Sequence, residues 1–231
     1  MAALAWRNLF RAPLRRLFTA VVIGLNLLAI CGTHAALGPT PEDRLAQWGT
    51  LIETAREMPE WQQVQIVNRF FNQIRFATDQ EQWRQADYWA TLAELLSANA
   101  GDCEDLSIAK YLTLRKVGVP AERLRLTYVK ALVGERRHVQ DHMVLSYHAT
   151  PETEPWVLDN LIDDIRPVSM RRDLIVLANF DARYRSSQTA SADSTPHPEP
   201  IPQWQELLRR MDSENAMQGT PGGSTEPLIQ P

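Results

Sequence analysis

The chain has 231 residues, of which 44% are hydrophobic, and this length suits one globular domain with extended ends rather than two full domains. Its 24 Lys and Arg residues are outnumbered by 28 Asp and Glu residues. This acidic balance disfavours nucleic-acid binding, because neutralising phosphates requires clustered positive charge.

The first 35 residues differ from the rest of the chain. Four arginines precede an apolar run over residues 17–31, and no acidic residue appears before Glu42. The run is shorter than the roughly 20 residues that span a bilayer, and small residues end at Ala35. Residues 1–35 are therefore predicted to be a secretory signal peptide cleaved after Ala35, with an uncleaved membrane anchor as the alternative.

Cleavage would change both the charge and the cysteine content. The mature chain would lose the four arginines and keep all 28 acidic residues, which leaves a formal charge of −8. It would also lose Cys31 and keep Cys103 as its single thiol. An exported protein with one cysteine has no intramolecular disulfide, so Cys103 is either buried and inert or reactive. Its neighbours decide between the two.

The first part of the presumed mature chain is helical by pattern. Apolar residues at three-to-four spacing predict amphipathic helices over 42–58 and 61–75, with Pro59 in the turn between them. The segment 76–100 is irregular apart from a short helix around 92–97.

A strongly apolar stretch over 103–117 follows Gly101 and Asp102 and stops before Gly118. The pattern predicts a buried helix. Cys103 is therefore predicted to lie at the N-terminus of this helix.

Beyond residue 120 the apolar period changes to that of a strand. Leu124, Leu126 and Tyr128 alternate with polar residues, and further short strands are predicted over 142–148, 156–159 and 166–169. Helices followed by antiparallel strands predict an α+β domain.

This domain is predicted to occupy residues 36–185. Residues 186–231 are predicted to form a flexible linker and tail, because the segment is rich in Ser, Thr and Pro and has little to bury. Within it, residues 203–211 are predicted to form a small helix.

A cysteine in the first turn of a buried helix lies where the helix dipole and free N–H groups favour a thiolate, which is typical of a nucleophile. Such a nucleophile needs a base and a group that orients the base. His142 and Asp159 lie on predicted neighbouring strands and can pair across them, whereas Asn160 points to the opposite face. We therefore predict a triad of Cys103, His142 and Asp159, although His142 taken singly would be read as a core histidine bonded to the backbone.

The remaining histidines are weaker candidates for the base. His138 is placed in the basic turn before the second strand, where a solvated role is favoured, and His148 lies towards the end of that strand. His197 lies in the predicted linker.

Four blocks of sequence carry a family resemblance: Asn99-Ala100-Gly101-Asp102-Cys103-Glu104-Asp105, Ser107-Ile108-Ala109-Lys110-Tyr111, Asp141-His142-Met143-Val144-Leu145 and Trp156-Val157-Leu158-Asp159-Asn160. Over about residues 45–180 the chain resembles the bacterial transglutaminase-like cysteine proteinases, whose best-known members are the LapG-type periplasmic proteases. The resemblance implies a papain/transglutaminase-like domain with Cys103 as nucleophile, His142 as base and Asp159 as orienting acid. The Cys103 backbone N–H and a second donor, for which the Trp89 indole is one candidate, would hold the oxyanion.

The resemblance also implies a substrate and a location. LapG-type enzymes cleave a large surface adhesin near its N-terminus at a di-alanine site, release biofilm cells, and are held inactive by an inner-membrane cyclic-di-GMP receptor of the LapD type. Location in the periplasm follows. No segment resembles a nucleotide site, so cyclic di-GMP would act through the receptor. Two alternatives remain, a protein-crosslinking transglutaminase and a non-catalytic calcium-dependent binding module.

Three carboxylates surround the predicted nucleophile. Asp102, Glu104 and Asp105 should raise the pKa of the thiol, and a bound cation would remove that conflict. Ligands that are all oxygen favour Ca²⁺ over Zn²⁺, and the resemblance implies calcium dependence. Three residues of one helix turn cannot all reach one ion, so another ligand, such as Asp87 or a carbonyl, is needed. The alternative is that Asp102 caps the helix and the others favour its dipole.

Overall fold

The computed structural model describes residues 38–150, 152–180, 182 and 201–218. The predicted signal peptide over 1–35, most of the predicted linker and the tail beyond 218 lie outside these residues, so the predicted division of the chain stays a prediction. Within the described ranges, no helix is both long and apolar enough to span a membrane.

The two predicted N-terminal helices are confirmed. Helix α1 (Pro41–Arg56) begins with a capping box, in which the Thr40 hydroxyl accepts the Asp43 N–H and the Asp43 carboxylate accepts the Thr40 N–H. Helix α2 (Glu60–Phe71) follows Pro59 and buries one apolar face. Both helices therefore start at residues suited to helix N-termini and contribute to one core.

The segment that the sequence predicts as irregular contains four short elements. Strand β1 (Arg75–Phe76) pairs in parallel with β2 (Ala100–Gly101), and helices α3 (Asp79–Gln82) and α4 (Leu92–Ala98) lie between them in the chain. The short helix predicted around residues 92–97 is confirmed as α4. The others are two to four residues long, too short to produce a periodic pattern.

Two residues bring the chain from α4 to the next helix. Asn99 has a φ of 49° in the left-handed region, which asparagine adopts more readily than most residues. A Cβ at Gly101 would lie 2.6 Å from Leu95 Cδ1 and 2.7 Å from Asp105 Oδ2. Glycine therefore allows the close approach of this backbone to the start of the next helix.

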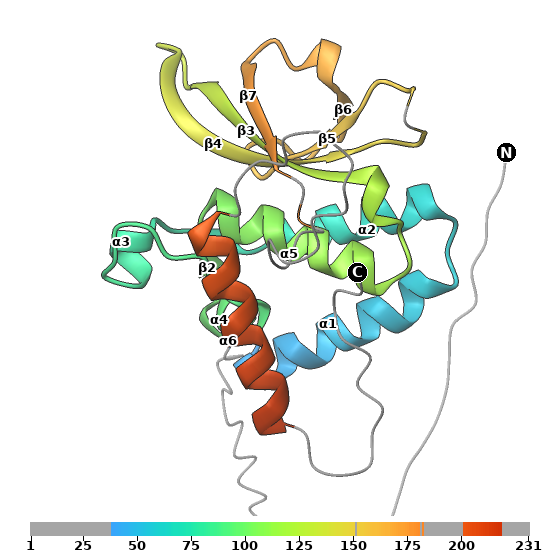
Figure 1. The fold of residues 1–231 in the computed structure, drawn as a ribbon, viewed down its shortest axis with the longest axis vertical. Coiled ribbons are helices and arrows are strands. Elements are labelled where there is room, and N and C mark those ends of the chain that lie inside the picture. The colour runs from blue at the N-terminus through green and yellow to red at the C-terminus, as the bar shows by residue number, and fades with distance from the viewer. Residues whose placement is uncertain (1–37, 151, 181, 183–200, 219–231) are drawn as a thin grey trace, which may run out of the picture. The chain divides into compact units, whose positions relative to one another are not determined.

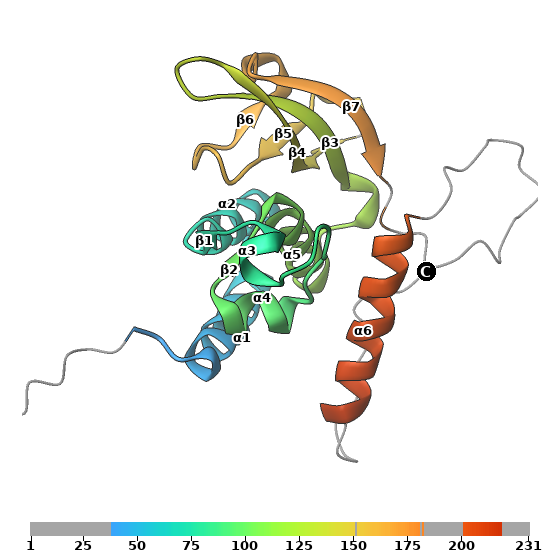
Figure 2. The same cartoon turned by 90° about the vertical axis from the view of Figure 1, so that its left-hand side faces the viewer.

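Helix α5 (Cys103–Lys116) is the buried helix that the sequence predicts, and it begins at Cys103. Residues on all of its sides are buried, from Leu106 in the second turn to Leu114 near its end. Figures 1 and 2 show the helices α5 and α2 packed beneath the β-sheet. The helix thus presents its N-terminus beside the sheet.

The sheet is antiparallel and has the order β6-β5-β4-β3-β7. The bounds of its strands are β3 Leu124–Val133, β4 His138–Tyr147, β5 Trp156–Leu158, β6 Arg166–Pro167 and β7 Leu174–Phe180. The α+β class and the predicted strands are confirmed. His138 is the first residue of β4, so its predicted place in the preceding turn was wrong, although its side chain is exposed as expected.

The last described helix, α6 (Pro202–Gln218), is longer than the helix predicted over 203–211. Its apolar side is buried, with Trp204 and Leu207 fully covered. The Trp204 ring lies edge-on to the Tyr111 ring of α5, with 6.2 Å between the centroids. Residues far apart in the chain therefore join the core around α5.

Candidate active site

The nucleophile position is built by the cap of α5. Asp102 is the N-cap residue, and its Oδ1 accepts the N–H groups of Glu104 (3.1 Å) and Asp105 (3.3 Å). In the reciprocal bond of this capping box, the Asp105 carboxylate accepts the Asp102 N–H at 3.3 Å. Cys103 is the first residue of the helix and is buried, with 8% of its surface exposed.

The thiol is held in its protonated form by its surroundings. Its Sγ donates a hydrogen bond of 2.7 Å to Glu104 Oε2. Burial raises the pKa of Cys103 well above its ordinary value, the charge and hydrogen bond of Glu104 and the charge of Asp102 raise it further, and the Met143 backbone N–H opposes them. The expected conflict between the helix N-terminus and the carboxylates is therefore present.

His142 of β4 and Asp159, the residue that follows β5, form a buried pair. His142 Nε2 lies 2.8 Å from Asp159 Oδ1, which also accepts the Leu161 N–H at 3.0 Å. Burial alone would raise the pKa of Asp159, but hydrogen bonds from His142, Leu161 and Arg171 lower it to about 2. An ionised carboxylate only accepts hydrogen bonds, so Nε2 carries the proton and Nδ1 is left as the basic nitrogen of His142.

Arg171 is a third member of this buried group, and no sequence pattern predicted it. Its Nη2 donates to Asp159 Oδ2 at 2.6 Å, and its Nε donates to Asp173 Oδ1 at 3.0 Å. Only 2% of Arg171 is exposed. A buried ionised Asp159 requires a partner for its second oxygen, so the need for a cation could have been foreseen, but not its position in the chain.

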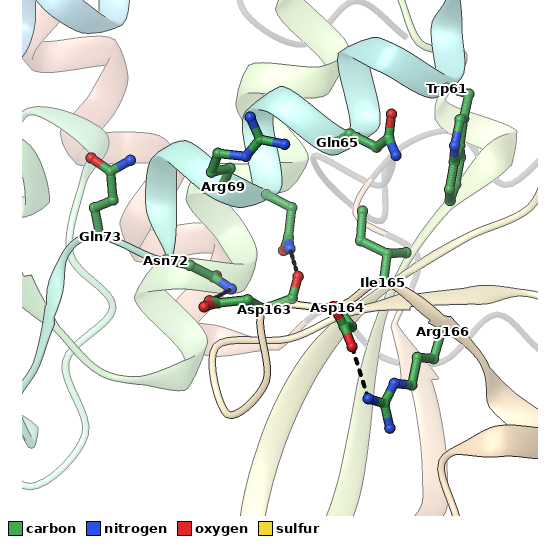
Figure 3. A pocket seen from close by; sticks show the side chains of 10 residues that line it. Trp61, Gln65, Arg69, Asn72, Gln73, Asp163, Asp164, Ile165 and Arg166 are labelled. Atoms are coloured by element: carbon green, nitrogen blue, oxygen red, sulfur yellow. Dashed lines mark hydrogen bonds and ion pairs between the residues drawn. The ribbon is translucent and has the colours of Figure 1, made fainter.

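The backbone of Asp159 is held from the opposite direction. Asn72 Nδ2 donates to the Asp159 carbonyl at 2.9 Å and to Asp163 Oδ1 at 3.1 Å. Asn72 and Asp163 line a polar pocket of about 590 Å³ between α2 and residues 163–166, shown in Figure 3. The orienting acid is therefore fixed through both its side chain and its main chain.

The two halves of the site meet at β4. Ser107 Oγ of α5 donates to the Met143 carbonyl at 3.0 Å, which links the helix that begins at Cys103 to the residue that follows His142. Among the described residues no hydrogen bond joins Cys103 to His142, and the thiol instead binds Glu104.

The acidic residues fall into two groups that share Asp102. In one group, ligand atoms of Asp102, Cys103 and Glu104 lie within 4.8 Å of one another, and in the other those of Asp79, Asp102 and Asp105 do. The three carboxylates singled out in the sequence do not form one group by themselves. The added carboxylate is Asp79 of α3.

Asp87, which the sequence offered as an additional ligand, belongs to neither group. It is exposed, and its Oδ2 accepts a hydrogen bond of 2.6 Å from Gln203.

These carboxylates fit a hard divalent cation. Burial, followed by the charges of Glu104 and Asp105, raises the pKa of Asp102 to about 9, and burial raises the pKa of Asp105 to about 7. Asp79 Oδ1 is buried and has no hydrogen-bond partner among the described residues. Crowded carboxylates and an unsatisfied oxygen are what a cation with oxygen ligands would relieve.

A family model described as bacterial transglutaminase-like cysteine proteinase BTLCP matches residues 46–173. The chain belongs to this family. It is therefore a cysteine peptidase, as the resemblance implied. No curated protein sequence matches the chain.

Among solved structures the chain is similar to LapG of Legionella pneumophila. One LapG structure is 41% identical, covers 62% of this chain and 75% of its own, and has a TM-score of 0.55. Calcium-bound LapG is 38% identical, with coverage of 76% and 92% and a TM-score of 0.62. EGTA-treated LapG is 35% identical, with coverage of 74% and 89% and a TM-score of 0.60.

In a cysteine proteinase of this family we expect one role for each reacting group. His142 Nδ1 would take the thiol proton, the Cys103 thiolate would attack the scissile carbonyl, and Asp159 would stabilise the imidazolium. The leaving amine would receive the proton from His142, and water activated by His142 would release the acyl group. Trp89 is 97% buried in the core, and its backbone carbonyl is bound by Arg210, so packing accounts for its place.

Proposed function

We propose that this cysteine proteinase is a calcium-dependent endopeptidase of the periplasm that cleaves the N-terminal region of a large surface adhesin at a di-alanine site and so releases biofilm cells. A cyclic-di-GMP receptor of the LapD type in the inner membrane would control it. The observation that carries the proposal is the overlap between the nucleophile and a carboxylate cluster, in a chain similar to calcium-bound LapG.

The calcium requirement is supported by the state of the thiol. Cys103 donates its hydrogen bond to Glu104, and both Glu104 and Asp102 raise its pKa. Bound calcium would supply positive charge at these carboxylates. Asp79, Asp102, Glu104 and Asp105 are the residues that would hold it. If Glu104 bound the calcium ion, it would no longer accept the thiol hydrogen bond, and the Cys103 thiol would be free to transfer its proton to His142.

The substrate, the receptor and the location rest on the similarity to LapG and on the arginine-rich, apolar N-terminus. Residues 1–35 would direct export, either as a cleaved signal peptide or as a retained anchor. The chain itself would bind neither nucleic acid nor cyclic di-GMP.

The direct test is cleavage of an adhesin fragment. The protein is incubated with the N-terminal region of a large surface adhesin, and with the same fragment after replacement of its two adjacent alanines by aspartates. We expect cleavage of the first fragment only, in calcium, none in EGTA, and recovery with calcium but not with magnesium. Full cleavage in EGTA would contradict the calcium requirement. Incorporation of a labelled amine in place of hydrolysis would indicate a transglutaminase.

The receptor is tested in the same assay. Adding a saturating amount of the periplasmic output domain of a LapD-type receptor should stop cleavage by binding near the active site. Equal rates with and without this domain would contradict the proposed control, while leaving the peptidase activity in place.

A further inference from the structure

Helix α6 binds the segment before and within α4 through several side chains, among them Gln203 to Asp87 and Glu214 to the Thr91 hydroxyl. Arg210 binds at the centre of this segment. Its Nη1 donates to the Tyr88 hydroxyl at 2.7 Å and to Glu94 Oε2 at 2.6 Å, and its Nη2 donates to the Trp89 carbonyl oxygen. The guanidinium also lies over the Tyr88 ring, 4.4 Å from its centroid. Only 18% of the Arg210 side chain is exposed. All of these Arg210 partners belong to residues 88–94, the segment before and within α4.

The same segment binds the carboxylate cluster with its backbone N–H groups. The Tyr88 N–H donates to Asp79 Oδ2 at 2.7 Å, and the Ala90 N–H donates to Asp105 Oδ1 at 2.7 Å. Asp79 and Asp105 are two of the three members of one acidic group. Residues 88–90 therefore lie between α6 on one side and the cluster on the other.

One peptide group joins the two sides. The Trp89 carbonyl, which Arg210 binds, and the Ala90 N–H, which Asp105 binds, are the two ends of the same planar trans peptide. They point in opposite directions, so a cation holds one end and a carboxylate holds the other. A charge-assisted bond at the carbonyl also polarises the peptide and makes its N–H a stronger donor.

Asp105 in turn belongs to the cap of the nucleophile helix. Its Oδ1 accepts the Ala90 N–H, while its Oδ2 accepts the Asp102 N–H at 3.3 Å. Rotation of the Asp105 carboxylate would break its bond to the Ala90 N–H, its bond to the Asp102 N–H, or both. Its orientation therefore depends on where the Ala90 N–H lies.

We propose that Arg210 is a positioning residue that clamps the Trp89–Ala90 peptide and thereby fixes the Asp105 carboxylate for cation binding. The inference rests on the proposed calcium dependence. It adds to the site a residue that lies 105 positions after Asp105 in the chain. Arg210 touches none of the reacting groups. Its effect is to keep Asp105 in the orientation that shares a cation with Asp79 and Asp102.

The chain offers a matched control in the preceding residue. Arg209 is on the same helix, but its side chain is 66% exposed, and its ion-pair partner among the described residues is Glu206, at 2.6 Å. Replacing either arginine by methionine removes a guanidinium while keeping a long unbranched side chain with good helix propensity. The two variants differ in whether the lost group contacts residues 88–94.

The test is calcium titration by isothermal calorimetry on the full chain, with thermal unfolding in EGTA as a separate measurement. We expect Arg210→Met to raise the calcium Kd by about tenfold or more, as loss of an outer partner of a metal ligand does, and Arg209→Met to leave it unchanged. Should Arg210→Met fail to fold, Arg210→Lys, which keeps the charge but not the forked geometry, takes its place with the same expectation.

Two results would overturn the inference, and they differ from each other. A lower unfolding temperature with an unaltered calcium Kd would make Arg210 a structural residue only. No calcium binding by the unmodified chain would contradict the calcium requirement itself, and the positioning role with it.

Discussion

The two halves of the candidate active site differ in how their charges are balanced. At the start of α5, burial and mutual repulsion raise the pKa of Asp102 and Asp105, and the Cys103 thiol is bound by Glu104. On the sheet, the Asp159 carboxylate is surrounded by donors, and its pKa is lowered to about 2.

The difference shows which half is complete within the chain. The His142–Asp159–Arg171 corner pairs its own buried charges and has its hydrogen bonds in place. At the start of α5, several carboxylates lie close together, and none of the described side chains that bind them is a cation. One half is preorganised by packing, and the other half is the one to which the proposed calcium ion would bind.

The strongest way to break this comparison is to remove one reacting group from each half. Cys103→Ala and His142→Ala should each reduce adhesin cleavage by about four orders of magnitude or more, and Asp159→Asn should remove most of the activity, since the triad acts as a unit. Rates of cleavage and thermal unfolding should be measured together. His138→Ala is the control, because His138 is exposed at the first position of β4. Retained proteolysis by Cys103→Ala, or loss of activity in His138→Ala, would contradict the assignment.

Glu104→Gln should raise the rate of thiol alkylation and lower the rate of substrate cleavage. Without its charge the pKa of Cys103 falls and a larger fraction of the thiol is ionised, so alkylation of the thiol in EGTA should become faster, by up to about tenfold. Cleavage in calcium should fall by about a hundredfold, because a metal ligand is lost.

The control for this experiment is Glu122→Gln, a change at an exposed residue of the 3-10 turn before β3. Its alkylation and cleavage rates should match those of the unmodified chain. Identical alkylation rates for Glu104→Gln would mean that Glu104 does not hold the thiol.

Arg171→Met should destabilise the half of the site that contains His142 and Asp159. A buried Asp159 without its cation costs about 3 kcal/mol of unfolding free energy at pH 7. The folded-state pKa of Asp159 lies below its unfolded value, so its contribution is present above about pH 4 and is lost as the pH falls towards 2. In the variant that pKa rises towards its unfolded value, so the loss on acidification should be smaller and should end at a higher pH. Denaturant titrations from pH 2 to pH 7 measure this, with the exposed neighbour in Arg172→Met as control.

The smallest effect on activity is expected at Lys110, two helical turns after Cys103. Lys110 is fully buried, its Nζ has no hydrogen-bond partner in the described part of the chain, and burial lowers its pKa to about 7 although Asp159 and Asp163 oppose the shift. A lysine whose folded pKa lies below its unfolded value destabilises the protein most below pH 7, and the penalty disappears as the pH rises through about 10.

Lys110→Met should therefore increase the unfolding free energy at pH 6 by about 2 kcal/mol or more, and the gain should shrink by pH 10. Cleavage should change little. Lys130→Met, in an exposed pair with Asp141, serves as the control. If Lys110→Met instead destabilised the protein at pH 6, the buried ammonium would have a hydrogen-bond partner, such as water, and the prediction would be contradicted.

The parts of the fold that could be predicted are those with a regular apolar period. Helices α1, α2 and α5 and the β3–β4 hairpin repeat apolar residues at helical or strand spacing. Strand β7 was missed because Leu174–Phe180 is a nearly continuous apolar run at a sheet edge, with Ile175, Val176 and Leu177 about half exposed, so it shows no alternation.

The candidate site divides in the same way. Cys103 could be placed because a cap and a buried helix adjoin it in sequence, and His142 and Asp159 because strand parity and family resemblance agree. Asp79, Arg171 and Arg210 are charged residues in short or irregular segments or on an ordinary amphipathic helix. Their burial follows from contacts across the fold, which no local pattern encodes.

The contact between α6 and the site also bears on the order of folding. The bond from Arg210 to Trp89 spans 121 residues, far more than the 15 between Ala90 and Asp105. Closing so long a loop costs more chain entropy than closing a short one, and residues 202–218 are synthesised after every other described element. A chain made from its N-terminus therefore forms the Asp102 cap early and the Arg210 clamp late. The proposed clamp on the Trp89–Ala90 peptide therefore forms only when synthesis of the described chain is nearly finished.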